Sequence, residues 1–432
     1  MPHTIILGGG LCGLAAALML ARDGHRVTVL ERDTAAVPRD PDAAWERWAR
    51  AGVAQFRQAH YMQPRGRHVL DAELPDVRHA LADAGALRFD PLTVMPPKIT
   101  DREPREGDER FVTWTARRST IEHVIASVAE AQDGIEIRRG VTVAALEQRS
   151  GQAPAVRTDT GERLTAELVV DAMGRGSALP RLLGAGSVHE RTDDGGFLYY
   201  TRYVRGTQPA IRGPITAHHG TYSLLTLPAD NGTWSVTIYG STRDSALKAA
   251  RDAAHWTELV QRTGRHDHWL DGEPLTGVMA MGGVMSRTRS VAHGVDGLVS
   301  LGDAWACTNP ALGRGMSFGL AHAALLRRAA REHAGRPAAL TASFAADTER
   351  ELAPYHRATL ATDRARLAEI DALLAGEQPP PANPLVRAML VDADVFRAAV
   401  EIIGCLALPQ EVFARPGFAE RVEAAAGLTV AL

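Results

Sequence analysis

Three glycines near the start of the chain, Gly8, Gly10 and Gly13, have the spacing of a phosphate-binding turn. In such a turn the first glycine permits a tight bend, the second lets a pyrophosphate approach the backbone, and the third lets a helix pack closely on a strand. The start of the next helix then offers unpaired N–H groups and a positive dipole end to the phosphates. Glu31 follows about 18 residues after the last glycine, near the ~20 expected for a carboxylate that binds ribose hydroxyls. The candidate residues of this dinucleotide site are Gly8, Gly10, Gly13, Leu14, Glu31 and Arg32.

A second group of such residues lies between Gly297 and Leu320. Asp303 follows the apolar run 298–301, which places a carboxylate at the carboxyl edge of a buried strand, where the ligands of α/β sheets bind. Pro310, Gly313 and Gly315 come soon after it, at the entry to an expected helix. Such an entry can stabilise negative charge on a bound group. The first glycine motif alone does not distinguish FAD from NAD, so the choice of cofactor rests on what the second segment resembles.

The second segment resembles the GD motif of the para-hydroxybenzoate-hydroxylase-like FAD monooxygenases, the class A flavoprotein monooxygenases and their relatives. The resemblance implies that Asp303 binds the ribityl chain or ribose of FAD and that Pro310 lies beside the isoalloxazine. It also implies that Gly313 and Gly315 present backbone N–H groups to the pyrimidine edge, so these two and Pro310 are the candidate catalytic positions. The cofactor-binding residues implied for this segment are Gly302, Asp303, Pro310, Gly313, Gly315 and Met316.

Two further segments extend the resemblance. Arg118 opens a segment similar to the family's Arg-x-x-Leu-Glu, whose arginine lies near the FAD, although Arg117 stands beside it. Gly174 matches the glycine of the family's Asp-Gly motif, but Met173 occupies the aspartate position. With methionine at this position, the segment resembles the Asp-Ala-Thr-Gly variant of the motif, which is found in halogenase-like, geranylgeranyl-reductase-like and epoxidase-like relatives. We therefore expect electrons from NAD(P)H either directly or through a partner flavin reductase.

The elements that must position these residues predict an α/β fold. Strands at 3–7 and 26–30 flank a helix at 11–22, as in a Rossmann-type FAD-binding domain with an inserted mixed β-sheet substrate domain and a C-terminal helical region. We divide the chain into an FAD-binding domain at 1–185 and 286–337, a substrate-binding sheet domain at 186–285 and the helical region at 338–432. Residues 66–84 and 339–376 are each predicted to form one helix.

The inserted sheet should cover the flavin and line the substrate pocket. Alternation along 197–204 puts Tyr199, Thr201 and Tyr203 on one face, which we take as the pocket face together with Trp234 on a second strand. The segment 53–62 also resembles bacterial polyether-epoxidase and squalene-epoxidase relatives. The expected substrate is an apolar small molecule, aromatic or of polyketide or terpenoid type.

Flavin chemistry needs little from side chains, since the resemblance implies that a C4a-hydroperoxyflavin is the oxidant while the protein binds, orients and excludes water. We expect hydroxylation or epoxidation with molecular oxygen. A prenyl-type reductase, a halogenase-like enzyme and a flavoprotein with non-redox cyclase activity remain alternatives. The halogenase is disfavoured because 233–238 lacks the paired tryptophans and proline of the WxWxIP segment, and Ala311-Leu312 replaces the serine-rich halide turn.

Composition excludes several other classes. A formal net charge of −3 gives no general attraction for nucleic acid or an anionic membrane. The three cysteines are far apart and form no CxxC pair, so we expect no metal site and a reduced, cytoplasmic protein. The longest apolar stretch near the N-terminus is too short to span a bilayer, and it lacks the features of a signal peptide.

Overall fold

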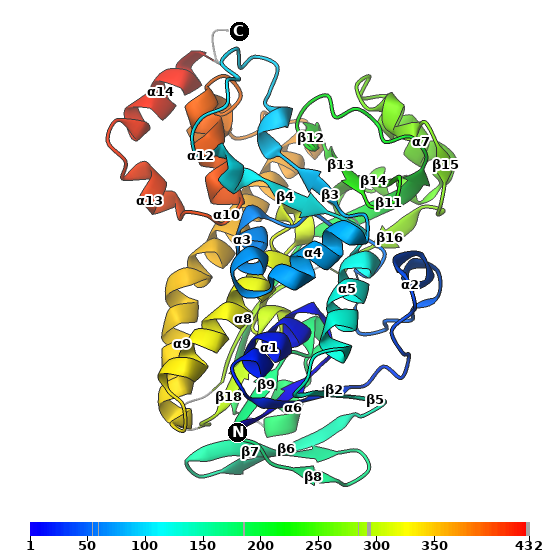
Figure 1. The fold of residues 1–432 in the computed structure, drawn as a ribbon. Coiled ribbons are helices and arrows are strands. Elements are labelled where there is room, and N and C mark those ends of the chain that lie inside the picture. Colours follow the sequence, from blue (N-terminus) through cyan, green and yellow to red (C-terminus); the bar gives the residue numbers. More distant parts are fainter. Residues whose placement is uncertain (54, 59, 185, 284, 292–294, 429–432) are drawn as a thin grey trace.

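The computed structural model describes residues 1–53, 55–58, 60–184, 186–283, 285–291 and 295–428 (Figure 1). Its central layer is a five-stranded parallel sheet in the order β18-β9-β1-β2-β5. These strands are β1 (His3–Leu7), β2 (Arg26–Glu31), β5 (Ile135–Arg139), β9 (Leu168–Asp171) and β18 (Leu298–Ser300). The register pairs Leu7 with Leu30 and with Asp171, so the carboxyl ends of β1, β2 and β9 lie at one edge. This is the α/β arrangement expected from the sequence.

The two faces of the central sheet are covered differently, because alternate residues of each strand point to opposite sides. Ile6 and Val170 pack into one core with α1 (Leu11–Arg22), α5 (Arg118–Glu130) and α8 (Gly315–Glu332). Ile5 and Val169 pack into another with α6 (Leu179–Leu183) and the antiparallel sheet β6-β7-β8. The strands of that sheet are β6 (Val143–Arg149), β7 (Gln152–Thr158) and β8 (Arg163–Leu164).

A second large sheet has the order β12-β13-β14-β11-β15, and β16 also pairs with β11. Its strands are β11 (Phe197–Arg205), β12 (Thr216–His219), β13 (Tyr222–Ala229), β14 (Thr233–Ser241), β15 (Glu273–Pro274) and β16 (Met279–Met281). Helix α7 (Ala253–Gln261) packs on one of its faces through Trp256, Leu259 and Val260. The opposite face carries Tyr199 and Tyr239 and packs against Leu367 and Ile370 of the C-terminal region.

Smaller elements connect these layers. They are α2 (Pro41–Arg47), α3 (Pro64–Glu73), α4 (Pro75–Asp83), β3 (Leu87–Phe89), β4 (Thr113–Thr115), β10 (Val188–Asp194), β17 (Met285–Val291) and β19 (Ala306–Cys307). The single helix predicted at 66–84 is wrong, because the chain is not helical at Leu74 and Pro75 begins a second helix.

The C-terminal region consists of α9 (Pro337–Glu351), α10 (Ala353–Leu374), α11 (Pro384–Ala388), α12 (Ala393–Ile403), α13 (Pro409–Phe413) and α14 (Phe418–Leu428). Here too one predicted helix, 339–376, is two: Leu352 separates α9 from α10, which carries Pro354 in its first turn, the position that proline tolerates best. Helix α10 lies beside the second sheet, and helix α12 lies beside the 90–111 connection (Figure 1). Among the described residues, no helix combines the length and apolar character needed to cross a membrane.

Candidate functional site

One cavity of about 510 Å³ extends from the glycine turn after β1 to the second sheet. Its lining includes most of the candidate residues: Gly8, Gly10, Glu31, Arg32, Arg118, Gly174, Asp303, Pro310, Gly313, Gly315, Met316, Tyr199 and Thr201. Segments far apart in the sequence therefore meet around a single space. Gly13, Leu14, Gly302, Tyr203 and Trp234 do not line it.

The glycine turn presents an open helix start to this cavity. Gly10 is the N-cap of α1, with no side-chain cap and no acidic residue in the first turn. A Cβ on Gly10 would meet no atom within 4 Å, whereas one on Gly13 would lie 2.2 Å from the carbonyl oxygen of Gly8. Gly10 thus leaves room for a phosphate, while Gly13 allows the turn itself to close. Leu14 is buried in the core behind them.

Glu31 ends β2 and holds the turn from the other side. Its carboxylate accepts hydrogen bonds from the backbone N–H of Gly9 at 2.8 Å and of Asp33 at 2.9 Å. Arg50 is buried beside it, 3.4 Å from one carboxylate oxygen, and donates to the carbonyl of Gly9 at 2.9 Å. Sequence reasoning missed Arg50, because nothing in the local pattern distinguishes a buried arginine from an exposed one. Glu31 therefore shapes the turn and also lines the cavity.

Asp303 lines the same cavity from the short 3₁₀ turn Gly302–Ala304 that follows β18. Its side chain makes no hydrogen bond or ion pair with any residue that the structure describes, although it faces the cavity. Burial raises the pKa of this carboxyl, and the positive charges of Arg118, Arg175 and Arg287 oppose that rise. A carboxylate left without a protein donor fits the hydroxyl groups of a bound sugar chain.

Helix α8 opens into the same cavity. Gly313 adopts φ +62°, a left-handed conformation that favours glycine, and α8 begins at Gly315 without a side-chain cap or an acid in its first turn. Both α1 and α8 therefore direct positive dipole ends toward one space. Their close packing depends on the missing side chains of Gly319 and Gly302, because a Cβ on Gly319 would lie 2.0 Å from the sulfur of Cys12 and one on Gly302 2.8 Å. Burial raises the pKa of the Cys12 thiol to about 12, as befits a packing residue.

The two arginines at the start of α5 have different roles. Arg118 lines the cavity and donates to Glu122 through Nε at 2.8 Å. Arg117 is fully buried and donates to Asp230, in the turn between β13 and β14, at 2.6 Å and to Asp42 of α2 at 2.7 Å. Arg117 thus ties the start of α5 to α2 and to the second sheet's β13–β14 turn, and Arg118 is the arginine that can reach a bound cofactor.

The loop after β9 contains the Met173 substitution. Asp171 is buried and accepts from the backbone N–H of Met173 at 3.1 Å and from the hydroxyl of Ser177 at 2.7 Å. Burial raises the pKa of its carboxyl. Gly174 has φ +67° and lines the cavity together with Met173 and Arg175. The loop is therefore held by Asp171 from within, and at position 173 it offers the cavity a thioether in place of a carboxylate.

The cavity face of the second sheet differs in part from the prediction. Tyr199 of β11 lies opposite Tyr239 of β14, and Thr201 opposite Thr237, so these four share a face. Trp234 has the other parity: it packs with Trp256 and Val236 on the far side and donates its indole N–H to Trp269 at 2.8 Å. The assignment of Trp234 to the pocket face is therefore wrong, and Thr237 lines the cavity instead.

Tyr203 shares the face of Thr201 but lies beyond the cavity. Its ring packs edge-on against Trp45, and its hydroxyl donates to the carbonyl of Gln58 at 3.0 Å. That carbonyl also accepts from His60 Nδ1 at 2.8 Å, and burial lowers the pKa of His60 to about 3. Gln58 and His60 both line the cavity, within the 53–62 segment that the sequence singled out. Ala54 and Ala59 of this segment lie outside the described residues.

These features fit FAD. Two uncapped helix starts, an unpartnered carboxylate and a cavity long enough to join them match a dinucleotide whose flavin end is anionic when reduced. No group of three or more His, Cys, Asp or Glu side chains among the described residues is arranged to hold a metal ion.

Comparison with known proteins agrees with this geometry. Residues 2–336 match the family model described as an FAD binding domain. The menaquinone reductase of Mycolicibacterium smegmatis is 28% identical over 334 residues, 73% of this chain and 73% of that protein. The kynurenine 3-monooxygenase of Salinispora arenicola is 26% identical over 362 residues, 80% of this chain and 76% of that protein.

Among solved structures, PqsL of Pseudomonas aeruginosa in complex with 2-aminobenzoylacetate superposes with a TM-score of 0.65 at 17% identity. The superposition covers 92% of this chain and 99% of that one, so the likeness extends over the whole fold. At this identity it supports the fold alone. The chain therefore belongs to the FAD binding domain family of class A flavoprotein monooxygenases and their relatives, and it is an FAD-dependent oxidoreductase.

Proposed function

We propose that the protein is an FAD-dependent monooxygenase that hydroxylates or epoxidises an apolar small molecule. The observation that carries this proposal is the single cavity, which joins the Gly8–Gly13 turn and Asp303 to a wall of Tyr199, Leu225 and Met281. Bound FAD would supply two-electron reduction and the activation of molecular oxygen.

The protein's own residues would do the rest. The start of α1 would hold the pyrophosphate, Glu31 the adenosine ribose and Asp303 the ribityl chain. Gly313 and Gly315 would present the start of α8 to the pyrimidine edge of the ring. Under the proposed division into an FAD-binding domain, a substrate domain at 186–285 and a helical region at 338–432, the last two would close the substrate end and exclude water.

The wall of the substrate end supports an apolar substrate with few polar contacts. Tyr199 stacks on Tyr239 with ring centroids 5.3 Å apart, and Met281 and Leu225 pack against the same pair. Thr201 donates to Gln58 at 2.9 Å and pairs with Thr237 at 2.8 Å, so these hydroxyls are partly satisfied within the protein. An aromatic, polyketide or terpenoid molecule fits such a wall.

The electron donor is a separate proposal. Because Met173 stands where the class A hydroxylases carry an aspartate, we infer that NAD(P)H binds only transiently or that a flavin reductase delivers the electrons. Anaerobic stopped-flow mixing with NADPH distinguishes these cases. Fast bleaching of the flavin by NADPH alone would overturn the partner-reductase version.

A reductase is the second candidate, favoured by the 28% identity to a menaquinone reductase. The two functions differ in their need for oxygen. Turnover under ¹⁸O₂ tests them: a monooxygenase places one labelled atom in the product, whereas a reductase gives an unlabelled product with two extra hydrogens in the absence of oxygen. A product that is an isomer of the substrate, with no added oxygen and no added hydrogen, would instead indicate a cyclase and overturn both the monooxygenase and the reductase.

A further inference from the structure

The loop 308–316, which carries Pro310, Gly313 and Gly315 on its cavity side, is held from behind by C-terminal helices. Those helices begin at Pro337 and lie outside residues 2–336, which match the FAD binding domain model. Two side chains of the loop, Asn309 and Arg314, make the connection. Both are buried, with 2% and 3% of their surface exposed.

Arg314 makes the larger set of contacts. It donates to Thr359 Oγ1 at 2.8 Å and to the carbonyl of Tyr355 at 3.3 Å, both on α10. It also donates to the carbonyls of Ile402 at 3.0 Å and Ile403 at 3.3 Å, the last two residues of α12. Carbonyls in the last turn of a helix lack intrahelical partners and carry the negative end of its dipole, so they suit a guanidinium.

Within the part of the chain that the structure describes, this arginine has no carboxylate in ion-pair contact. No ion pair of Arg314 occurs within 4.0 Å among the described residues, whereas Arg50, Arg117 and Arg118 each have at least one. Its charge is met by neutral carbonyls, a hydroxyl and the ring of Tyr355, whose centroid lies 5.7 Å from the guanidinium carbon. A buried cation whose hydrogen-bond partners are all dipolar leaves a positive potential around it, which the carboxyl of Asp363 on α10 opposes only from beyond ion-pair distance.

Asn309 gives the loop a second anchor. Its amide donates to Asp363 of α10 at 2.8 Å and accepts the hydroxyl hydrogen of Tyr199. The same loop is thereby tied to α10 at two points, one on each side of Pro310 and Gly313. A change in the position of α10 would be transmitted to the loop through both residues.

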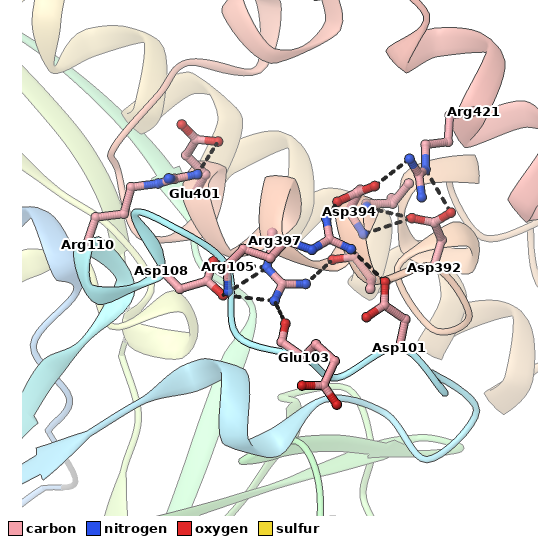
Figure 2. Close-up of polar contacts among 12 residues, drawn as sticks. Asp101, Glu103, Arg105, Asp108, Arg110, Asp392, Asp394, Arg397, Glu401 and Arg421 are labelled. Atoms are coloured by element: carbon pink, nitrogen blue, oxygen red, sulfur yellow. Dashed lines mark hydrogen bonds and ion pairs between the residues drawn. The ribbon is translucent and has the colours of Figure 1, made fainter.

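Helix α12 is fixed at its other end by charged residues (Figure 2). Arg397 donates to Asp108 at 2.8 Å and to the carbonyl of Glu103 at 2.9 Å, and Arg421 binds Asp392 at 2.8 Å and Asp394. Beneath this charged cluster Phe396 packs in a small core with Met95, Ile99 and Phe111. The helix thus has a defined position from the surface cluster to the carbonyls that bind Arg314.

We propose that Arg314 is a positioning residue through which α10 and α12 set the geometry of the cofactor loop, and that its buried charge raises the reduction potential of the bound flavin. The backbone of the loop lies between the Arg314 guanidinium and the cavity, at the uncapped start of α8. A positive potential there favours the extra negative charge of reduced over oxidised flavin. The proposal rests on the placement of FAD proposed above but not on oxygen chemistry.

The test compares R314K and R314M by FAD dissociation constant, visible spectrum and midpoint potential. In R314M we expect affinity for reduced FAD to fall at least ten-fold more than affinity for oxidised FAD, which lowers a two-electron potential by about 30 mV. R314K keeps the charge but not the planar fork, so its potential should stay near that of the wild type while FAD binding weakens. An unchanged potential in R314M would overturn the inference.

Two controls keep the result interpretable. R163A breaks an exposed ion pair with Glu147, at 2.8 Å on the β6-β7-β8 sheet, without touching the loop or the helices that hold it, so an equal potential shift in R163A would mean general loosening and overturn the role of Arg314. If R314M does not retain FAD, T359V removes the 2.8 Å acceptor and should shift the flavin spectrum and weaken FAD binding; an unaltered T359V would contradict the proposal. The D303A variant separates a failure of the proposed FAD placement from a failure of the proposed role of Arg314. An unchanged FAD affinity in D303A would mean that the placement of FAD is wrong.

Discussion

The two ends of the cavity are built by different means. At the FAD end, backbone turns and helix starts form the walls; their shape depends on Gly8, Gly13 and Gly313, and Gly10 leaves the space beside the turn open. At the substrate end, the walls are side chains of β11 and β14, and whether a residue faces the cavity depends on strand register. The first end therefore tolerates almost no change of residue type, whereas the second can change its lining without losing the fold.

The largest expected effect separates two glycines of one turn. G10A should fold normally, because its φ of −85° suits alanine and its Cβ meets no protein atom, yet that Cβ would occupy the space of the pyrophosphate. We expect FAD affinity to fall by at least about a hundred-fold, since hydrogen bonds to a charged group contribute about 1.5–3 kcal/mol each. Titration of apoprotein with FAD measures this.

G13A is the matched variant. Its Cβ would lie 2.2 Å from the carbonyl oxygen of Gly8, so the helix must move away from the strand. We expect the apoprotein itself to lose about 1–3 kcal/mol of stability, measured by urea unfolding. Equal stability of G10A and G13A apoproteins would break the distinction between a glycine for the ligand and a glycine for the fold.

The next effect is a loss of FAD affinity at Asp303, whose side chain is expected to bind the cofactor and has no partner among the described residues. D303A removes an acceptor for a sugar hydroxyl, a bond worth about 1.5–3 kcal/mol, so the FAD dissociation constant should rise roughly ten- to a hundred-fold. Stability of the apoprotein should not fall, because this carboxylate makes no hydrogen bond with described residues. An unchanged dissociation constant would place the ribityl chain elsewhere.

At the substrate end, T237F and W234F test the two faces of β14. T237F would put a ring into the cavity and should abolish turnover while FAD binding remains. W234F removes the indole hydrogen bond to Trp269 on the far face and should cost about 1–3 kcal/mol of stability with little change in kcat. The reverse pattern would mean that the register of β14 is misassigned.

The smallest effect is a pH dependence at the C-terminal anchor. Burial raises the pKa of Asp363 from 3.8 to about 6, while the Asn309 amide and Arg314 oppose the rise. Because the folded state holds this proton more tightly than the unfolded chain, the contribution of Asp363 to stability falls as the pH rises from about 4 to 6 and is constant above. The stability of D363N relative to wild type should therefore increase from pH 4 to pH 7. A difference between the two proteins that is independent of pH would contradict this.

The same contrast explains how far the sequence could predict the site. Glycine spacing and the acids after β2 and β18 are local signals, so Gly8, Gly10, Glu31 and Asp303 were found from the sequence and all line the cavity. The prediction puts Trp234 on the wrong face because alternation gives two faces without saying which is inward. The predicted single helices at 66–84 and 339–376 run through Pro75 and Pro354, although proline in a first turn marks a new helix.

Residues that act through tertiary contacts had no local signal. Arg50 and Arg314 look like surface arginines until the fold buries them beside Glu31 and behind the cofactor loop. Asp363 lies in a charged helix, where nothing in the sequence indicates its contact with Asn309. The C-terminal region could thus be predicted as helical, but its hold on the FAD loop required the structure.

A crystal structure with FAD bound tests the central claim most directly, that one cavity holds the dinucleotide at the glycine turn and the flavin ring before the second sheet. The account predicts the pyrophosphate at the start of α1, the ribityl chain within hydrogen-bond distance of Asp303, and the ring between Pro310 and the Tyr199 wall. A flavin ring that lies away from Pro310 and Gly313, or a ribityl chain that does not reach Asp303, would contradict it.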